Sequence, residues 1–274
     1  MDKDATFVTT QNSYVENKQT NKQKGVAELS KDGCDSFHAA EDGEDEAQKN
    51  VFVWYACYGS NLLEERFNCY LRGGRVDGMS RNCVGARDTT PASRSLVMSM
   101  PYRVFFAHAG DWGWGYGGDA MLDVRPDETY MCCMRLYKVT LQQFNDIIAQ
   151  ENDLVPPLPS GNWLTCDQLS HLQREEPGSL RLQFEIGDYP AVAYLGEHDD
   201  TAIVTFTCLT DTVRKFLREE LPVASPSQNY LAVLRRGLQE AGLDEAEAIN
   251  YWNEIITRQF VKYTSKASDI NEQK

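Results

Sequence analysis

The sequence predicts one domain of mixed α/β class, from about residue 50 to residue 265, with a small curved or closed sheet of five to seven strands and helices packed around it. Short runs rich in β-branched and aromatic residues, the first at 51–57, alternate with segments whose apolar residues recur at helical spacing, the first at 63–71. Residues 1–49 are polar, end in an acidic cluster and are poor in apolar side chains, so we expect a disordered tail there. Residues 266–274 are assigned to a disordered C-terminus.

The first strand leads directly into a turn and a helix. The run at 51–57 reads as a buried strand, and Gly59 allows a sharp turn after it. Asn61 is a favoured N-cap residue, with Glu64 three positions later. The first backbone N–H groups of a helix have no intrahelical partner and lie at the positive end of its dipole. This junction therefore predicts a pocket for a carboxylate or a phosphate.

A second strand and helix end in a carboxylate. Residues 131–140 read as a strand, and Thr140 can cap the helix predicted at 141–151. Glu151 falls toward the apolar stripe of that helix instead of its solvated side. A carboxylate in that position is either paired, frayed past the helix end, or held in a partly apolar site with its pKa raised.

An insertion follows the glutamate at residues 154–180, with a proline-rich loop and a short helix at 166–173. It reads equally well as a lid or as an ordinary surface excursion. The remaining elements are predicted from apolar periodicity. We expect strands at 180–186, 191–195 and 202–208, and helices at 211–220, 230–238 and 245–262.

Four segments, in the right order, resemble the γ-glutamylcyclotransferase-like family, which includes the γ-glutamyl cyclotransferases and the plant avirulence-induced proteins of that fold. The first is the turn Tyr58, Gly59, Ser60, Asn61 and Leu62, which is similar to the family signature after the first strand. The others are the segment 114–122 with its paired glycines Gly117 and Gly118, the strand and helix ending in Glu151, and the segment 222–243 containing Tyr230.

The resemblance implies a compact β-barrel of parallel and antiparallel strands with a pocket at one end. It implies that Glu151 is the general acid/base, and that the Tyr58–Leu62 turn, Gly117, Gly118 and Tyr230 bind the substrate. Gly117 and Gly118 read alternatively as part of a flexible surface loop, and Tyr230 as an aromatic residue packed on the core. The chain departs from the family at Asp119, where a small or apolar residue is common, which affects the expected choice of substrate.

The implied substrate carries its own nucleophile. In a γ-glutamyl amide the α-amino group attacks the γ-carbonyl, which gives 5-oxoproline and a free amine or amino acid. The protein needs to hold the substrate folded, and one glutamate can take and return the proton. Two alternatives stay open: a relative that acts on γ-glutamylamines or a specialised metabolite, and a catalytically silent binding protein of the same fold.

The sequence contains none of the usual motifs for zinc, phosphate or dinucleotide binding. The four histidines are scattered, and the sequence contains no Cys-x-x-Cys pair, phosphate loop or dinucleotide fingerprint, so we expect no metal and no cofactor. A net charge of −14 argues against nonspecific binding to nucleic acid or to an acidic membrane surface. The start of the chain has no signal-peptide pattern, and no apolar run approaches a membrane span. We expect a cytoplasmic protein with reduced cysteines and a small-molecule γ-glutamyl substrate.

Overall fold

The computed structural model describes residues 43–271, except residues 112, 160, 162, 179 and 180. The backbone alone is described for residues 181 and 261–271. The tail expected at residues 1–42 lies outside the described residues.

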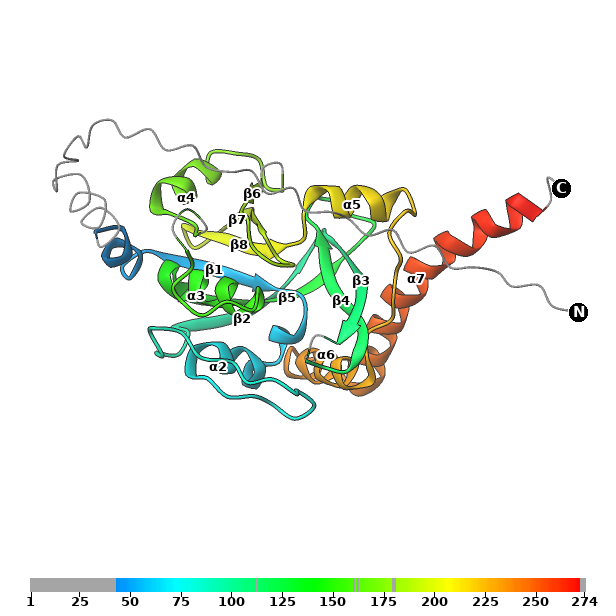
Figure 1. Cartoon of the computed structure of the whole chain (residues 1–274), viewed down its shortest axis with the longest axis horizontal. Coiled ribbons are helices and arrows are strands. Elements are labelled where there is room, and N and C mark those ends of the chain that lie inside the picture. The colour runs from blue at the N-terminus through cyan, green and yellow to red at the C-terminus, as the bar shows by residue number, and fades with distance from the viewer. Residues whose placement is uncertain (1–42, 112, 160, 162, 179–180, 272–274) are drawn as a thin grey trace, which may run out of the picture. The chain divides into compact units, whose positions relative to one another are not determined.

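Six strands form one mixed sheet in the order β2–β5–β1–β8–β7–β6 (Figure 1). Strand β1 pairs antiparallel with β5 and parallel with β8, as the resemblance implied for a mixed sheet. The sheet stays open at its edges β2 and β6, so it is a curled half-barrel, and the predicted mixed α/β class is confirmed. The strands are β1 (Phe52–Cys57), β2 (Arg94–Met100), β5 (Cys132–Thr140), β6 (Arg181–Gln183), β7 (Ala191–His198) and β8 (Thr201–Thr207).

Strand β1 is buried on both faces. Trp54 and Ala56 belong to one hydrophobic core, together with residues of α6 and α7, whereas Val53 and Tyr55 belong to a second core, together with residues of α2 and α3. Successive side chains of a strand point to opposite faces, so helices on each side explain the unbroken apolar run.

Strands β3 (Arg103–Asp111) and β4 (Tyr116–Asp123) form a separate two-stranded ribbon. Thr207, the last residue of β8, joins this ribbon to the sheet: its Oγ1 accepts from the N–H of Leu122 and donates to the carbonyl of Leu122, both at 2.9 Å. Gly117 and Gly118 lie within β4, so the interpretation of these glycines as part of a flexible surface loop is wrong. A Cβ added at Gly117 would lie 2.3 Å from the backbone N of Ser227, which explains why a glycine is needed there.

The helices follow the predicted pattern. Thr140 and Gln143 form a complete capping box at the start of α3, which confirms the predicted cap. Helix α7 continues to Asn271, within the segment 266–274 that the sequence analysis assigned to a disordered C-terminus. The helical elements are η1 (Ser60–Leu62), α2 (Glu64–Arg72), α3 (Leu141–Glu151), α4 (Cys166–Leu172), α5 (Thr210–Leu217), α6 (Gln228–Glu240) and α7 (Glu245–Asn271).

The described residues before position 50, the predicted start of the domain, contact the rest of the chain. Residues 43–48 are helical, and their acidic side chains contact the domain. Asp45 accepts hydrogen bonds from Arg87 at 2.7 Å and from Gln142 at 3.1 Å. The carboxylate of Glu44 accepts from the backbone N–H of Cys166 at 2.8 Å, at the start of α4. Part of the acidic cluster is thus paired with specific donors instead of belonging to a free tail.

Candidate functional site

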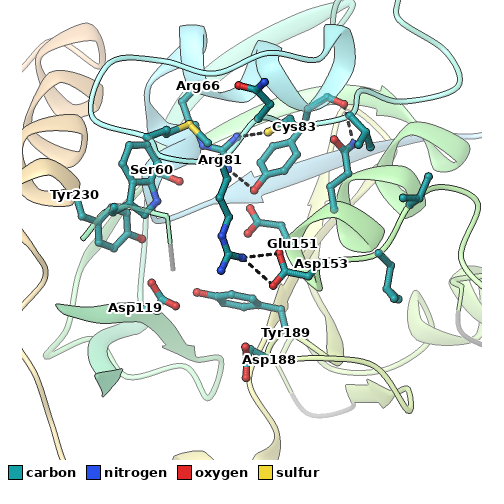
Figure 2. A pocket seen from close by; sticks show the side chains of 18 residues that line it. Ser60, Arg66, Arg81, Cys83, Asp119, Glu151, Asp153, Asp188, Tyr189 and Tyr230 are labelled. Carbon is teal, nitrogen blue, oxygen red and sulfur yellow. Dashed lines mark hydrogen bonds and ion pairs between the residues drawn. The ribbon is translucent and has the colours of Figure 1, made fainter. Parts of the chain in front are cut away.

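Two neighbouring cavities lie beside the C-terminal end of α3. The outer cavity has a volume of about 240 Å³, and the inner one of about 30 Å³. Both are lined by Ser60, Glu151, Tyr189 and Tyr230 (Figure 2). The turn after β1, the end of α3, the segment before β7 and the start of α6 therefore meet at one site.

Glu151, the predicted acid/base, is the last residue of α3 and lines both cavities. Its Oε1 accepts a hydrogen bond from Nδ2 of Asn61 at 3.0 Å, and the hydroxyl of Tyr70 also donates to this carboxylate. Burial raises the pKa of Glu151, whereas the charge of Arg66 and the two hydrogen bonds act in the opposite direction. The net result is a pKa above the ordinary glutamate value, as expected for a group that both takes and returns a proton.

Asn61 does not cap α2, so that prediction is wrong. Leu63 occupies the N-cap position, and Asn61 lies in the preceding 3₁₀ turn, where its side chain is buried. Its Nδ2 donates to Glu151 and to the hydroxyl oxygen of Tyr55, the latter at 2.9 Å. The backbone carbonyl of Asn61 accepts a hydrogen bond from the hydroxyl of Tyr137 at 3.1 Å. The turn thus fixes an amide against the carboxylate instead of starting the helix.

The N-terminus of α2 already holds an anion from the same chain. The backbone N–H of Glu64 donates to Oε2 of Glu240 at 3.0 Å, and Arg135 donates to the same oxygen at 2.7 Å. The N-terminus of α2 thus binds a carboxylate, as its dipole predicts, but this carboxylate belongs to α6 of the same chain. The inner cavity lies beside the preceding turn, where Tyr58, Gly59, Ser60 and Asn61 line it.

Tyr230 packs on the core and also lines both cavities. Its ring stacks on Trp114 with a centroid distance of 5.7 Å, and its side chain is buried. Its hydroxyl reaches the turn, because a Cβ added at Gly59 would lie 3.0 Å from it. The backbone N–H groups of Ala120 and Ser60 bond this hydroxyl, while burial raises its pKa, so it stays protonated. Ser227 positions the residue by capping α6 at the N–H of Tyr230.

The other predicted binding residues divide into two groups. Tyr58 lines the inner cavity, and its hydroxyl donates to the carbonyl of Phe206 at 3.0 Å. Leu62, Gly117 and Gly118 line neither cavity. Leu62 is fully buried and its carbonyl accepts from Arg135, whereas the glycines make room for the segment 224–227. Their contribution to the site is structural.

Arg66 was missed by the sequence analysis. Its side chain is buried and lines the outer cavity, and its guanidinium donates to the hydroxyl of Tyr70 and to Sγ of Cys83, the latter at 3.1 Å. Arg66 and Tyr70 are four positions apart on α2, so their pairing was visible in the sequence. Together, Arg66, Tyr70 and Glu151 form a chain of donors that ends at the carboxylate.

Carboxylates also gather at the outer cavity. Asp119, on β4, lies there with Asp153 and Asp188, and Arg81 forms an ion pair with Asp153 at 3.0 Å (Figure 2). Burial raises the pKa of Asp119 to about 8, and the charges of Glu151, Asp188 and Asp153 act in the same direction. Among the described residues of the insertion, only Leu154 and Val155 line the cavity.

Within residues 43–271, apart from the gaps, no group of three or more His, Cys, Asp or Glu side chains is arranged to hold a metal ion. None of the helices described there is long and apolar enough to cross a membrane.

Comparisons with known proteins give one clear sequence relative. A scan against protein-family models found no match. Over 213 residues the chain is 37% identical to Histone deacetylase 5 of Arabidopsis thaliana, an alignment that covers 76% of this chain and 31% of that protein. The chain thus spans about a third of the length of this relative.

Solved structures give distant likenesses. A γ-glutamyl cyclotransferase matches with a TM-score of 0.39 and 14% identity, over 74% of this chain and 86% of that chain. An uncharacterized human protein matches with a TM-score of 0.37 and 13% identity, over the same shares of the two chains. At these TM-scores the likenesses carry no conclusion about the reaction of this chain.

Proposed function

We propose that the chain is a γ-glutamyl cyclotransferase, which releases 5-oxoproline and a free amine or amino acid from a γ-glutamyl substrate. The observation that carries the proposal is the environment of Glu151. This carboxylate faces two cavities, accepts hydrogen bonds from Asn61 and Tyr70, and has a pKa raised by burial. A carboxyl group with these properties is suited to take a proton from an ammonium and return it to a departing amine.

The reaction balances without a co-reactant. Glu151 takes a proton from the α-ammonium of the substrate, and the freed amine attacks the γ-carbonyl to form the new C–N bond of the lactam ring. The bond between the γ-carbon and the departing nitrogen then breaks as Glu151 returns the proton to that nitrogen. The ring nitrogen gives up its second proton as the lactam forms, and the departing amine takes up one proton more and leaves as an ammonium. The protein contributes proton transfer and a folded substrate geometry.

Charge develops on the γ-carbonyl oxygen during the attack. In our proposal the hydroxyl of Tyr230 donates to it, and the N–H groups of Ser60 and Ala120, which bond that hydroxyl, hold it in place near Gly59. The buried guanidinium of Arg66, whose Nε has no hydrogen-bond partner, attracts the α-carboxylate. A cytoplasmic location and a small-molecule substrate stay predictions.

The test is 5-oxoproline release from a panel of γ-glutamyl dipeptides, glutathione and γ-glutamylamines. Glu151→Gln should lower kcat/KM at least about a hundredfold, the scale of one general acid/base. Glu175→Gln is the matched control, since Glu175 is exposed in the insertion and lines neither cavity. Release that survives Glu151→Gln would remove the assigned role.

A silent binding module is the second candidate. The match to a third of Histone deacetylase 5 favours it, because the name of that longer protein refers to another activity. Absence of release from every panel member, together with calorimetric binding of one of them, would support this candidate over the enzyme.

A further inference from the structure

The outer cavity carries more negative than positive groups. Two guanidinium groups line it, and both are engaged: Arg81 with Asp153, and Arg66 with Tyr70 and Cys83. Four carboxylates line the same cavity, namely Asp119, Glu151, Asp153 and Asp188. When all of these groups are ionised, the lining has an excess of negative charge.

Asp119 is a half-buried carboxylate of this cavity. Its side chain forms no hydrogen bond and no ion pair within the described residues. In Figure 2 it lies beside the hydroxyl of Tyr189, with Tyr230 close by and Asp188 below. Partial burial of an unpaired carboxylate disfavours its ionised form unless a cation reaches it. The cavity therefore lacks a positive group at this position.

Substrate charge distinguishes the two γ-glutamyl classes. A γ-glutamyl amino acid has two carboxylates and one ammonium, so it enters with net negative charge and places its second carboxylate on the amine side. A γ-glutamyl conjugate of a diamine has one carboxylate and two ammonium groups, so it enters with net positive charge. A lining with excess carboxylates repels the first class and attracts the second.

The walls near Asp119 suit an alkylammonium group. The aromatic rings of Trp114, Tyr189 and Tyr230 line the same cavity, and ring faces attract cations. Val84 and Val155 are exposed at the cavity and offer apolar surface to a methylene stem.

We infer that Asp119, with Asp188 beside it, forms an amine-side subsite that selects γ-glutamyl conjugates whose departing amine carries a second, cationic group. Asp119 is thus a specificity-determining residue and takes no part in the proton transfer. The inference rests on the proposed function for its substrate class, but its binding component can be measured without turnover.

The first experiment compares γ-glutamyl-1,5-diaminopentane with γ-glutamylpentylamine, which has the same carbon chain without the second ammonium. The wild type should prefer the diamine conjugate in kcat/KM by at least about tenfold, mainly through KM, which corresponds to about 1.4 kcal/mol. Asp119→Asn, an isosteric change, should remove most of this preference. Asp167→Asn, at an exposed position of α4 outside both cavities, should leave the preference intact.

The second experiment measures binding of free 1,5-diaminopentane and of pentylamine by calorimetry. The wild type should bind the diamine more tightly, and Asp119→Asn should lose the difference. Equal affinities in the wild type would overturn the subsite, whether or not the protein turns over any substrate. Release of 5-oxoproline at equal rates from both conjugates would overturn the subsite while the proposed function stands. Discrimination in binding without release would uphold the subsite and count against the proposed function.

Discussion

Nδ2 of Asn61 lies 3.0 Å from Oε1 of Glu151 and 2.9 Å from the hydroxyl oxygen of Tyr55. This amide connects the turn after β1 to the end of α3, which lies ninety positions further along the chain. It holds one oxygen of the carboxylate and favours its ionised form, so it orients the proposed base and limits the rise of its pKa.

Asn61→Ala should lower kcat by about tenfold to a hundredfold, since a carboxylate displaced by a fraction of an ångström loses alignment with the substrate. The acid limb of the pH profile should also move to higher pH. Loss of a donor to the ionised form raises the pKa of Glu151 further, so the base becomes available only at higher pH.

Asn68→Ala, at a half-buried position of α2 outside both cavities, is the control and should leave the pH profile unchanged. A fall in kcat for Asn61→Ala without movement of the acid limb would mean that Asn61 acts on something other than the carboxylate.

Arg66→Met should move the acid limb in the same direction, because the guanidinium lowers the pKa of Glu151. KM should rise as well, since the variant loses the charge proposed to attract the α-carboxylate. Arg66→Lys keeps the charge and should restore much of the pH profile, although lysine lacks the planar fork that reaches Tyr70 and Cys83 together. Identical profiles for the two variants would show that the charge of Arg66 is irrelevant to Glu151.

The preference for a cationic departing amine should depend on pH. The pKa of Asp119 is raised to about 8 by burial and by the neighbouring carboxylates, so this group is largely neutral below that pH and ionised above it. The ratio of kcat/KM for the diamine and pentylamine conjugates should therefore rise as pH passes about 8. Taking the ratio cancels the titration of Glu151, which affects both substrates. In Asp119→Asn the ratio should be flat with pH.

The stability of the fold should respond to the same group. Since the folded-state pKa of Asp119 lies above its unfolded value, the protein loses stability as pH rises toward about 8. Asp119→Asn should raise the denaturation midpoint relative to the wild type at pH 9 and change it little at pH 4. Denaturant unfolding at the two pH values measures this difference, and an equal effect at both would contradict the assigned burial of the charge.

Gly59→Val should cost more activity than Ser60→Ala. A Cβ at Gly59 would already lie 3.0 Å from the Tyr230 hydroxyl, and a valine would displace that hydroxyl from the turn. Ser60→Ala keeps the backbone N–H and should change kcat/KM by no more than about threefold, against at least about tenfold for Gly59→Val. Gly43→Val is a control for the added bulk, because a Cβ there meets nothing within 4 Å. Equal losses at Gly59 and Ser60 would mean that backbone donors are not what the turn contributes.

Thr207→Val should destabilise the fold more than Thr205→Val. Thr207 satisfies both the N–H and the carbonyl of Leu122, whereas Thr205 satisfies only the carbonyl of Ala56, at 2.7 Å. Each buried polar group left unpaired costs about 1–3 kcal/mol, so the difference should be of this size in the free energy of unfolding. Both threonines are fully buried, which makes Thr205 a matched comparison. A smaller loss at Thr207 would contradict its role in holding the β3–β4 ribbon.

Periodicity and caps determined most of the elements. The apolar run before Tyr58 became β1, and the Thr140 cap began α3 as predicted, since both depend on residues close in sequence. Strand β2 was not assigned, because it is an edge strand with much of its surface exposed and gives a weak apolar pattern. The sequence left a surface loop open for Gly117 and Gly118, because the close contact that requires glycine there is with the distant segment 224–227.

The sequence by itself placed Glu151 toward the apolar side of its helix, and the family resemblance supplied its expected role as acid/base. Tertiary structure alone decided its partners. Asn61, Tyr70 and Arg66 reach Glu151, or one another, only after α2 and α3 pack on the same side of the sheet. Tertiary structure also directed Asn61 away from capping α2, because the amide of Asn61 is used by Glu151 and Tyr55, and the helix N-terminus is satisfied by Glu240. Local pattern fixes where a chain coils or extends, whereas the pairing of buried polar groups depends on contacts between distant segments, which no local pattern encodes.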